Sequence, residues 1–272
     1  MNKTSGSHPC IALFTLNSAI SSQSVNDFIG NHHDQISLVI VSNPLSTRRG
    51  GSIRQFIRHY RHSGLKYSLF LSYNFIIYPV LLAARLFISK LVGGKCRILS
   101  IREQCRLYNI QYRCCDNIND SQIFRVLEDQ GVELIISCFF DQILSNEIVK
   151  IPLKSCLNIH PGILPACRGV FPEFHTAAGK FTDFGFTIHR IDDASIDTGR
   201  ILLTRIVNVN GMKNMLMVGR KILSEGLTAL TDILPEIDSH LKNARPQGDG
   251  NYYSHPDRAD IRKLEDAGFT LW

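Results

Sequence analysis

The first part of the chain alternates short apolar segments with polar ones. Residues 10–16 (CIALFTL) and 37–41 (SLVIV) are brief apolar runs bounded by polar residues, which is typical of buried strands. Between them, residues 17–24 offer several N-cap side chains for a helix that ends near residue 29. The order strand, helix, strand predicts the opening of a parallel α/β sheet.

The rest of the chain continues this alternation. Strands are predicted at residues 110–114, 133–140, 155–159, 185–191 and 201–209. Helices are predicted at residues 53–62, 98–106, 120–130, 171–180 and 213–237, with a further short helix in the polar tail 243–272. Pro172 falls in the first turn of one of these helices, where proline is tolerated. We therefore expect an α/β fold with a mostly parallel sheet.

Residues 65–92 form a long apolar and aromatic segment. Lys66, Asn74, Pro79, Arg85 and Lys90 interrupt it. A transmembrane helix needs about 20 apolar residues with few charges, and an arginine within the span is costly in lipid. The interruptions favour two amphipathic helices that pack on the protein body or on a partner subunit, as in a homodimer. A helix on a membrane surface and a true span stay as alternatives.

Composition agrees with a globular protein that has a core. Of the 272 residues, 44% are apolar and 20% are charged, so one large domain, or one domain with an appendage, is expected. The net charge of +6 suits a ligand with a phosphate or carboxylate group but is too small to indicate nucleic acid. The eight cysteines include no C-x-x-C pair, which predicts no metal site and fits a reducing cytoplasm. The apolar run near the N-terminus is short for a secretory signal and fits a first strand better.

Polar residues at the end of one predicted strand suggest a chemical site. Asn158 and His160 are two positions apart, so on a strand they point to the same face. A proline and a glycine then end the strand. Ligands bind α/β sheets at the carboxyl ends of the strands, and the fold can bring Asp197, in a later loop, to the same edge. An amide, an imidazole and a carboxylate suit acyl transfer, because they can stabilise an oxyanion and move a proton.

Taken alone, an Asn-x-His sequence beside a proline is more often part of a turn than part of a catalytic site. Here it lies within SCLNIHPGILPACRG, which is followed by TIH and DTG. These motifs resemble the signature of the folate-dependent formyltransferase family, N-[IVL]-H-P-x-L-L-P-x-[YFR]-[RK]-G followed by T-[VIL]-H and D-x-G. The resemblance is strong over residues 133–209, and the 39 positions from Asn158 to Asp197 agree with it. Gly162 and Cys167 depart from the common family residues at positions that do not perform the chemistry.

The resemblance implies a Rossmann-like formyltransferase domain and 10-formyltetrahydrofolate as the formyl donor, without a metal. In that family the substrate amine attacks the formyl carbon. Asn158 and protonated His160 would then stabilise the oxyanion, and Asp197 would keep His160 charged and help move the amine proton through water. The pterin would lie, mostly through backbone contacts, against the loop up to Asp197, including Asp193, and against Phe140, Asp141, Gln142, Ile143 and Leu144.

Four further polar residues lie near these motifs or strand ends. Asn17, Arg168 and His175 are candidates for binding the acceptor: Asn17 follows the first strand, Arg168 suits an anionic group, and His175 suits the amine. A surface arginine and a structural histidine within a helix are the alternatives for the last two. His189 ends a strand and is expected to support the sheet.

The motifs leave the acceptor amine open. Methionyl-tRNA formyltransferase adds a C-terminal β-barrel. Here we expect a catalytic domain at residues 1–209, with an apolar helical insertion near 53–95, and only a helix and tail at 210–272. Glycinamide ribonucleotide formyltransferase has a Gly-rich phosphate loop where residues 17–20 stand here without glycine. We therefore favour an amino sugar, often nucleotide-linked, as acceptor. Hydrolysis of 10-formyltetrahydrofolate and a non-catalytic folate-binding role stay as alternatives.

Overall fold

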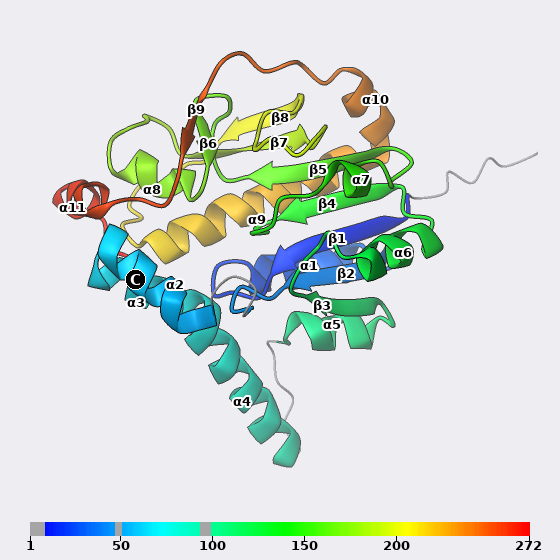
Figure 1. Ribbon diagram of the computed structural model, residues 1–272, viewed down its shortest axis with the longest axis horizontal. Helices are drawn as coiled ribbons and strands as arrows, with labels where there is room; N and C mark the ends of the chain where they lie inside the picture. Colours follow the sequence, from blue (N-terminus) through cyan, green and yellow to red (C-terminus); the bar gives the residue numbers. More distant parts are fainter. Residues whose placement is uncertain (1–8, 47–50, 93–98) are drawn as a thin grey trace, which may run out of the picture.

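A central seven-stranded sheet organises the computed structural model, which describes residues 9–46, 51–92 and 99–272. The first five strands in spatial order run parallel, and the last two are antiparallel to their neighbours. The predicted α/β fold with a mostly parallel sheet is confirmed (Figure 1). In spatial order the strands are β3 (Gln111–Cys115), β2 (Ile36–Ser42), β1 (Ile11–Leu16), β4 (Leu134–Cys138), β5 (Ser155–His160), β7 (Gly185–Arg190) and β8 (Ile201–Ile206).

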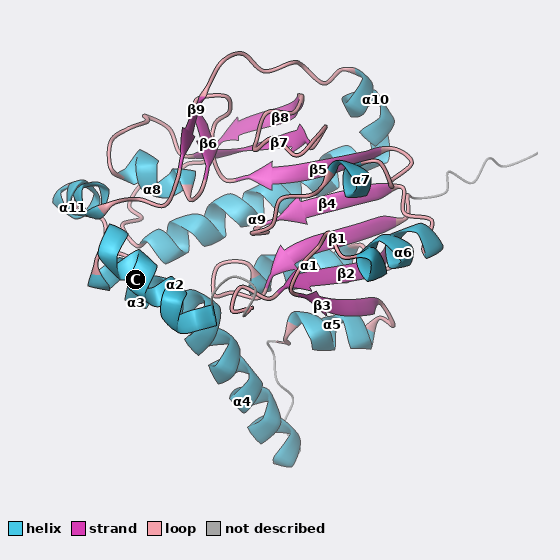
Figure 2. Cartoon of the chain, in the orientation of Figure 1, coloured by secondary structure: helices cyan, strands magenta, loops and turns pink. Residues whose placement is uncertain are grey.

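Helices cover both faces of this sheet (Figure 2). One face packs against α1 (Ser22–Asn31), α5 (Ile101–Leu107) and α9 (Met215–Ile233), and the other against α6 (Ser121–Asp129) and α7 (Asn146–Val149). Alternate residues of β1 enter the two cores, because side chains along a strand point to opposite faces. This two-sided burial explains why the central strands are continuous apolar runs in the sequence.

Helix α9 belongs to the same core as the sheet, although the sequence placed it after the expected end of the catalytic domain. It starts at Asn214, whose side chain accepts a hydrogen bond from the Met217 N–H. It approaches the sheet closely at Gly226, where an added Cβ would lie 2.7 Å from Cγ2 of Ile159. It ends at Ile233 and is followed by the 3₁₀ turn η3 (Leu234–Glu236) and helix α10 (Ile237–Lys242), which together replace the single helix predicted to residue 237.

The C-terminal segment returns across the carboxyl edge of the sheet. Its strand β9 (Asn251–Tyr253) pairs in parallel with β6 (Cys167–Gly169), and α11 (Arg258–Asp266) packs near α8 (Pro172–Ala177). The sequence predicted the helix in this tail but neither short strand, because three residues carry no measurable periodicity. Pro172 begins α8 as predicted, but the helix ends at Ala177 rather than near residue 180.

The insertion between β2 and β3 is helical throughout its described part. It contains α2 (Gly51–Ser63), α3 (Leu65–Ser72), the π-helical segment η2 (Tyr73–Ile77) and α4 (Tyr78–Leu91). The prediction of two separate helices in residues 65–92 was wrong, because α3, η2 and α4 follow one another without a break. Pro79 stands at the second residue of α4, next to the wider π turn, so its missing N–H does not end the helix. Residues 65–89 are long and apolar enough, by length and composition, to cross a membrane.

Candidate active site

The carboxyl end of β5 presents two of the predicted side chains together. Asn158 and His160 lie two positions apart on β5, which pairs with β4 on one side and β7 on the other. The antiparallel register places Asn158 opposite His189 of β7. The imidazole of His160 is buried, and its Nε2 lies 2.7 Å from the carbonyl oxygen of Cys167. The sheet therefore fixes both side chains at one edge.

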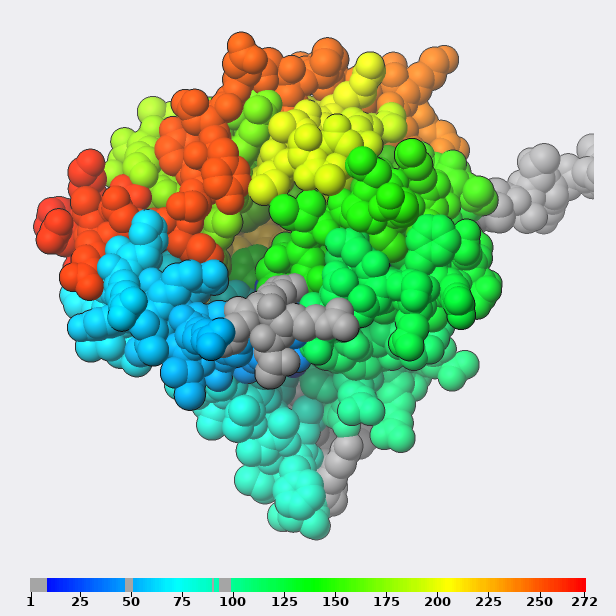
Figure 3. All heavy atoms as spheres, in the orientation of Figure 1, coloured from blue at the N-terminus to red at the C-terminus, as the bar shows by residue number. Residues whose placement is uncertain are grey.

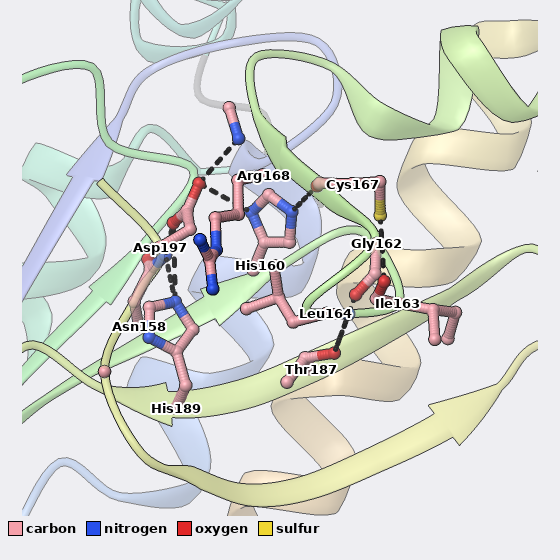
Figure 4. Close-up of polar contacts among 12 residues, drawn as sticks. Asn158, His160, Gly162, Ile163, Leu164, Cys167, Arg168, Thr187, His189 and Asp197 are labelled. Carbon is pink, nitrogen blue, oxygen red and sulfur yellow. Dashed lines mark hydrogen bonds and ion pairs between the residues drawn. The ribbon is translucent and has the colours of Figure 1, made fainter. Parts of the chain in front are cut away.

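Asp197 joins them from the loop between β7 and β8. Its Oδ2 lies 3.4 Å from Nδ1 of His160 and accepts a hydrogen bond of 2.8 Å from the Gly169 N–H. Its Oδ1 lies 3.3 Å from Nδ2 of Asn158 and 3.4 Å from Nε2 of His189 (Figure 4). Asp197 has a φ of 53°, a left-handed conformation that Asp adopts more readily than most residues. The structure thus brings Asn158, His160 and Asp197 into contact.

His189 takes a larger part in this cluster than the sequence suggested. Its Nδ1 lies 2.7 Å from the carbonyl oxygen of Arg190, and its Nε2 lies 3.1 Å from Nδ2 of Asn158. When Nδ1 carries the proton, Nε2 accepts one N–H of the Asn158 amide. His189 therefore orients Asn158 as well as supporting the sheet. The TIH motif carried this signal, because its histidine ends the strand that pairs with the Asn-x-His strand.

The charges of the cluster follow from burial and from mutual contact. Burial alone would raise the pKa of Asp197, but the neighbouring imidazoles of His160 and His189 and the Gly169 N–H hold it below its ordinary value. Burial lowers the pKa of His160, and the attraction of Asp197 opposes that effect only in part. Both ring nitrogens of His160 nevertheless face oxygen atoms, an arrangement that only the protonated ring satisfies with two N–H donors. The cluster is built to hold an imidazolium between two acceptors.

A large cavity opens beside the cluster. Its volume is about 860 Å³, and Asn158, His160, His189 and Asp197 contribute to its lining. Figure 3 shows this side of the molecule hollowed between the blue and cyan insertion, the green middle of the chain and the orange-red tail. The space is large enough for a drug-sized ligand with room for a second one, because such pockets usually measure about 300–1,000 Å³.

The loop expected to hold the pterin lies on this cavity. Phe140, Asp141, Gln142, Ile143, Leu144 and Asp193 all contribute to its lining. The amide of Gln142 is turned toward the protein body, where it accepts from the Ile118 N–H at 2.7 Å and donates to Ser42 Oγ at 2.7 Å. Asp193 accepts from the Ser195 N–H at 2.7 Å and so shapes its own loop. These bonds engage the Gln142 amide and the Asp193 carboxylate within the protein, and binding of the pterin by this loop stays a prediction.

The three residues predicted to bind the acceptor are not among the described residues that line the cavity. Asn17 accepts a hydrogen bond from Ser22 Oγ at 2.9 Å, at the start of the segment leading to α1. Arg168 donates to the Gly248 carbonyl oxygen at 2.9 Å, which ties β6 to the tail. His175 is buried, with Nε2 2.8 Å from the Ser254 carbonyl oxygen. Each of the three side chains thus has a hydrogen-bond partner within the protein, and a role in binding the acceptor stays a prediction.

The insertion and the tail supply a cavity wall that the sequence did not predict. Phe56 and His59 of α2 line it together with Tyr252 and His255 of the tail. Burial and the neighbouring His59 and Arg58 lower the pKa of His255 to about 3, so this imidazole is neutral near pH 7. Other aromatic residues of the tail pack on the body: Tyr253 contacts His175, Phe269 contacts Phe184, and Trp272 contacts Phe70. Only the fold reveals this wall, because its parts are almost 200 residues apart in the sequence.

Within the described part of the chain, no group of three or more His, Cys, Asp and Glu side chains is arranged to hold a metal ion. None of the seven cysteines that the structure describes forms a disulfide; Cys96 lies outside the described residues. The site therefore offers amide, imidazole and carboxylate groups beside backbone donors and acceptors.

A mostly parallel α/β sheet with an Asn–His–Asp cluster and a large cavity at its carboxyl edge is a Rossmann-like arrangement, in which ligands bind at the carboxyl ends of the strands. Residues 106–234 match the model of the formyl transferase family. This match confirms, over these residues, the resemblance seen in the motifs.

The curated relatives that the chain resembles are formyltransferases as well. The chain is 26% identical over 141 residues to methionyl-tRNA formyltransferase of Alcanivorax borkumensis, covering 52% of this chain and 42% of the relative. It is 23% identical over 158 residues to GDP-perosamine N-formyltransferase of Brucella melitensis, covering 58% and 60%. The chain thus spans about half the length of the curated relatives it matches.

The fold is shared with solved formyltransferases. A sugar N-formyltransferase of a Shewanella species superposes with a TM-score of 0.54 at 18% identity, covering 94% of this chain and 87% of that one. Glycinamide ribonucleotide transformylase 1 of Symbiobacterium toebii gives 0.59 at 15% identity, covering 91% and 97%. The N-formyltransferase of Helicobacter canadensis, solved with folinic acid and dTDP-3-aminofucose, gives 0.55 at 16% identity, covering 95% and 80%.

Proposed function

We propose that the protein transfers the formyl group of 10-formyltetrahydrofolate to a primary amine of a small biosynthetic substrate. The observation that carries the proposal is the contact of Asn158, His160 and Asp197 at the wall of one large cavity. The residues present fit a folate, because a loop with its Gln142 amide turned inward lies on the same cavity. The donor would supply an activated formyl group at this place.

Each side chain has a separate task in the proposed reaction. The amine nitrogen forms a bond to the formyl carbon, and negative charge develops on the formyl oxygen. The amide of Asn158 and the positive charge of His160 stabilise that oxygen, which lowers the free energy of the transition state. Asp197 holds the charged imidazole in place and helps to move the amine proton, through water, to the folate nitrogen. The bond from the formyl carbon to the folate nitrogen then breaks, and that nitrogen leaves protonated.

We further propose an amino sugar, carried on a nucleotide, as the acceptor. The Brucella relative acts on GDP-perosamine by its name, and the Helicobacter structure holds a dTDP-linked amino sugar. The insertion and tail that line the cavity here would form the acceptor side, because Phe56, His59, Tyr252 and His255 lie on its lining apart from the folate loop. Neutral histidines and aromatic rings suit a sugar or a base, which present hydroxyl groups and flat faces.

The test is tetrahydrofolate release from 10-formyltetrahydrofolate, followed by absorbance. The panel contains nucleotide-linked amino sugars, glycinamide ribonucleotide, methionyl-tRNA and a reaction without amine. Release that depends on an amino sugar supports the proposal. Release without any amine would make the protein a hydrolase, and folate binding without turnover on any amine would make it a binding protein.

A further inference from the structure

Helix α4 carries an exposed apolar stripe along one side. With the residues that flank the helix, eight positions follow the spacing of three and four that places side chains on one face. Phe87 is 64% exposed and Leu91 is 70% exposed, and their neighbours on the stripe are exposed as well. The stripe consists of Ile77, Val80, Leu81, Ala84, Phe87, Ile88, Leu91 and Val92.

The opposite side of α4 is covered at two positions. Leu82 and Leu86 are buried there, at positions on the other side of the helix from the stripe. Figure 1 shows α4 extending away from the sheet beyond the rest of the insertion. A helix that is apolar all round is normally covered all round. The stripe is thus available to a partner outside the chain.

The charge of the surrounding segment identifies the kind of partner. Residues 35–102 contain eleven Lys and Arg and no Asp or Glu, whereas the other residues hold 19 Lys and Arg against all 24 Asp and Glu. The small net charge of the chain therefore conceals one strongly basic segment. Arg54, Arg58, Arg61 and Arg85 are exposed within it. Lys66 is exposed too and pairs with Glu265 of α11 at 2.6 Å.

We propose that α4 docks the protein on an anionic lipid surface and lies in the plane of the interface. An apolar stripe within a basic segment suits an anionic bilayer, because apolar side chains can enter the acyl boundary while cations such as Arg85 of the same helix face the headgroups. A second copy of the chain fits the stripe less well than a lipid surface does, because pairing of two such basic segments would bring their like charges together. The inference does not depend on the proposed reaction.

The helix lies on the bilayer and does not cross it. Helix α4 has 14 residues. At 1.5 Å per residue it is about 21 Å long, and the hydrocarbon core of a bilayer is about 30 Å thick. The apolar stretch before it is not free to extend the span, since Tyr67 and Phe70 of α3 are fully buried. Tyr67 Oη also lies 2.9 Å from His255 Nδ1, which fixes α3 to the tail.

Vesicle binding tests the proposal with the full chain. The protein is sedimented with vesicles of phosphatidylcholine alone and with vesicles that contain about 30% phosphatidylglycerol, a content that gives an anionic surface. The stripe variant is Phe87→Ser, Ile88→Ser, Leu91→Ser. The control variant is Leu107→Ser, Leu153→Ser, Ile206→Ser, which removes three apolar side chains of similar exposure elsewhere on the surface. Circular dichroism checks that each variant keeps its helices and its melting temperature.

The expected result has three parts. The parent and the control variant bind the anionic vesicles, and high salt weakens this binding. The stripe variant needs at least about tenfold more lipid for half-binding, because three apolar side chains no longer enter the interface. Absence of binding, equal binding to both kinds of vesicle, or equal binding by the stripe variant would overturn the proposal. So would light scattering that shows a stripe-dependent dimer that does not bind vesicles.

Discussion

The Oδ2 atom of Asp197 lies 3.4 Å from Nδ1 of His160, although the two residues come from a loop and from a strand with β7 between them in the sequence. Asp197 is almost fully buried, which alone would raise its pKa. The facing His160 is the main cause that outweighs this effect and holds the pKa below its ordinary value. The carboxylate therefore carries its charge next to an imidazole that burial tends to neutralise. The following predictions test what this contact and its surroundings do.

Replacing Asp197 by Asn should abolish most of the activity and leave the fold intact. Asn tolerates the left-handed backbone conformation of this position, and its amide oxygen can still accept from the Gly169 N–H. What is lost is the negative charge beside His160. We expect kcat for formyl transfer to fall by about 100-fold or more, by analogy with the loss of one group that stabilises transition-state charge.

The exposed Asp183 supplies the control for this measurement, as Asp183→Asn changes a surface carboxylate away from the cavity. Both variants are compared by steady-state kinetics and by thermal unfolding. Near-normal turnover of Asp197→Asn would reject the role assigned to the carboxylate.

His189 should matter for rate more than for binding. Its Nε2 accepts from Asn158 Nδ2 at 3.1 Å, so His189→Phe would remove the acceptor that orients the amide. We expect kcat to fall roughly tenfold or more with a smaller change in KM for folate, the size typical of losing a partner that orients a reacting group. His189→Gln, which retains a hydrogen-bonding group, should recover part of the rate. Equal loss in both variants would favour a packing role instead.

Gly199 should be intolerant of any side chain. A Cβ added there would overlap the carbonyl oxygen of Arg190, whereas one added at Gly248 would meet nothing within 4 Å. Asp197 lies two residues before Gly199 in the same loop. Gly199→Ala must therefore displace the loop that carries Asp197. We expect lower stability, by about 1–3 kcal/mol as for other overpacked positions, together with loss of activity. Gly248→Ala is the control, and chemical denaturation with a kinetic assay measures both effects.

Glu173 should make the protein less stable as the pH rises. It is 1% exposed, its Oε2 has no hydrogen-bond partner among the described residues, and burial raises its pKa to about 8 from an ordinary value of 4.5. Between these two values the folded protein keeps a proton that the unfolded chain has lost. Within that window the free energy of unfolding falls by up to about 1.4 kcal/mol for each pH unit.

Glu173→Gln removes this ionisation while it preserves the shape of the side chain. The variant should match the parent near pH 5 and exceed its free energy of unfolding near pH 8 by at least about 1 kcal/mol. Glu128→Gln, at an exposed position on α6, serves as the control. Parallel curves for the parent and Glu173→Gln across this range would contradict the assignment.

The sequence predicted those parts of the fold that rest on local pattern. The central strands were found because burial on both faces gives continuous apolar runs, and the shared face of Asn158 and His160 followed from their spacing on a strand. Asp197 was placed only through the family motif, because no local property of a loop residue tells which strand end it will meet.

What the sequence missed depends on contacts between distant segments. Tyr252 and His255 reach the cavity because β9 pairs with β6, a three-residue pairing with no signal of its own. Asn17, Arg168 and His175 looked available for an acceptor, but Ser22, Gly248 and Ser254 bind them into the structure. The continuity of the helical insertion past Pro79 also escaped notice, because a π turn has no composition by which it can be recognised.

That π turn, η2, determines the direction in which the side chains of the following helix α4 point around the helix axis. Its Phe75 and Ile76 lie on the cavity lining, and the next residue, Ile77, begins the apolar stripe. A π turn holds about one residue more than an α turn, and each residue of an α-helix turns the following ones by about 100°. Deletion of one residue within η2 would therefore swing the stripe of α4 around the helix axis toward the protein. The one additional residue of this π turn thus determines which way the apolar stripe of α4 faces.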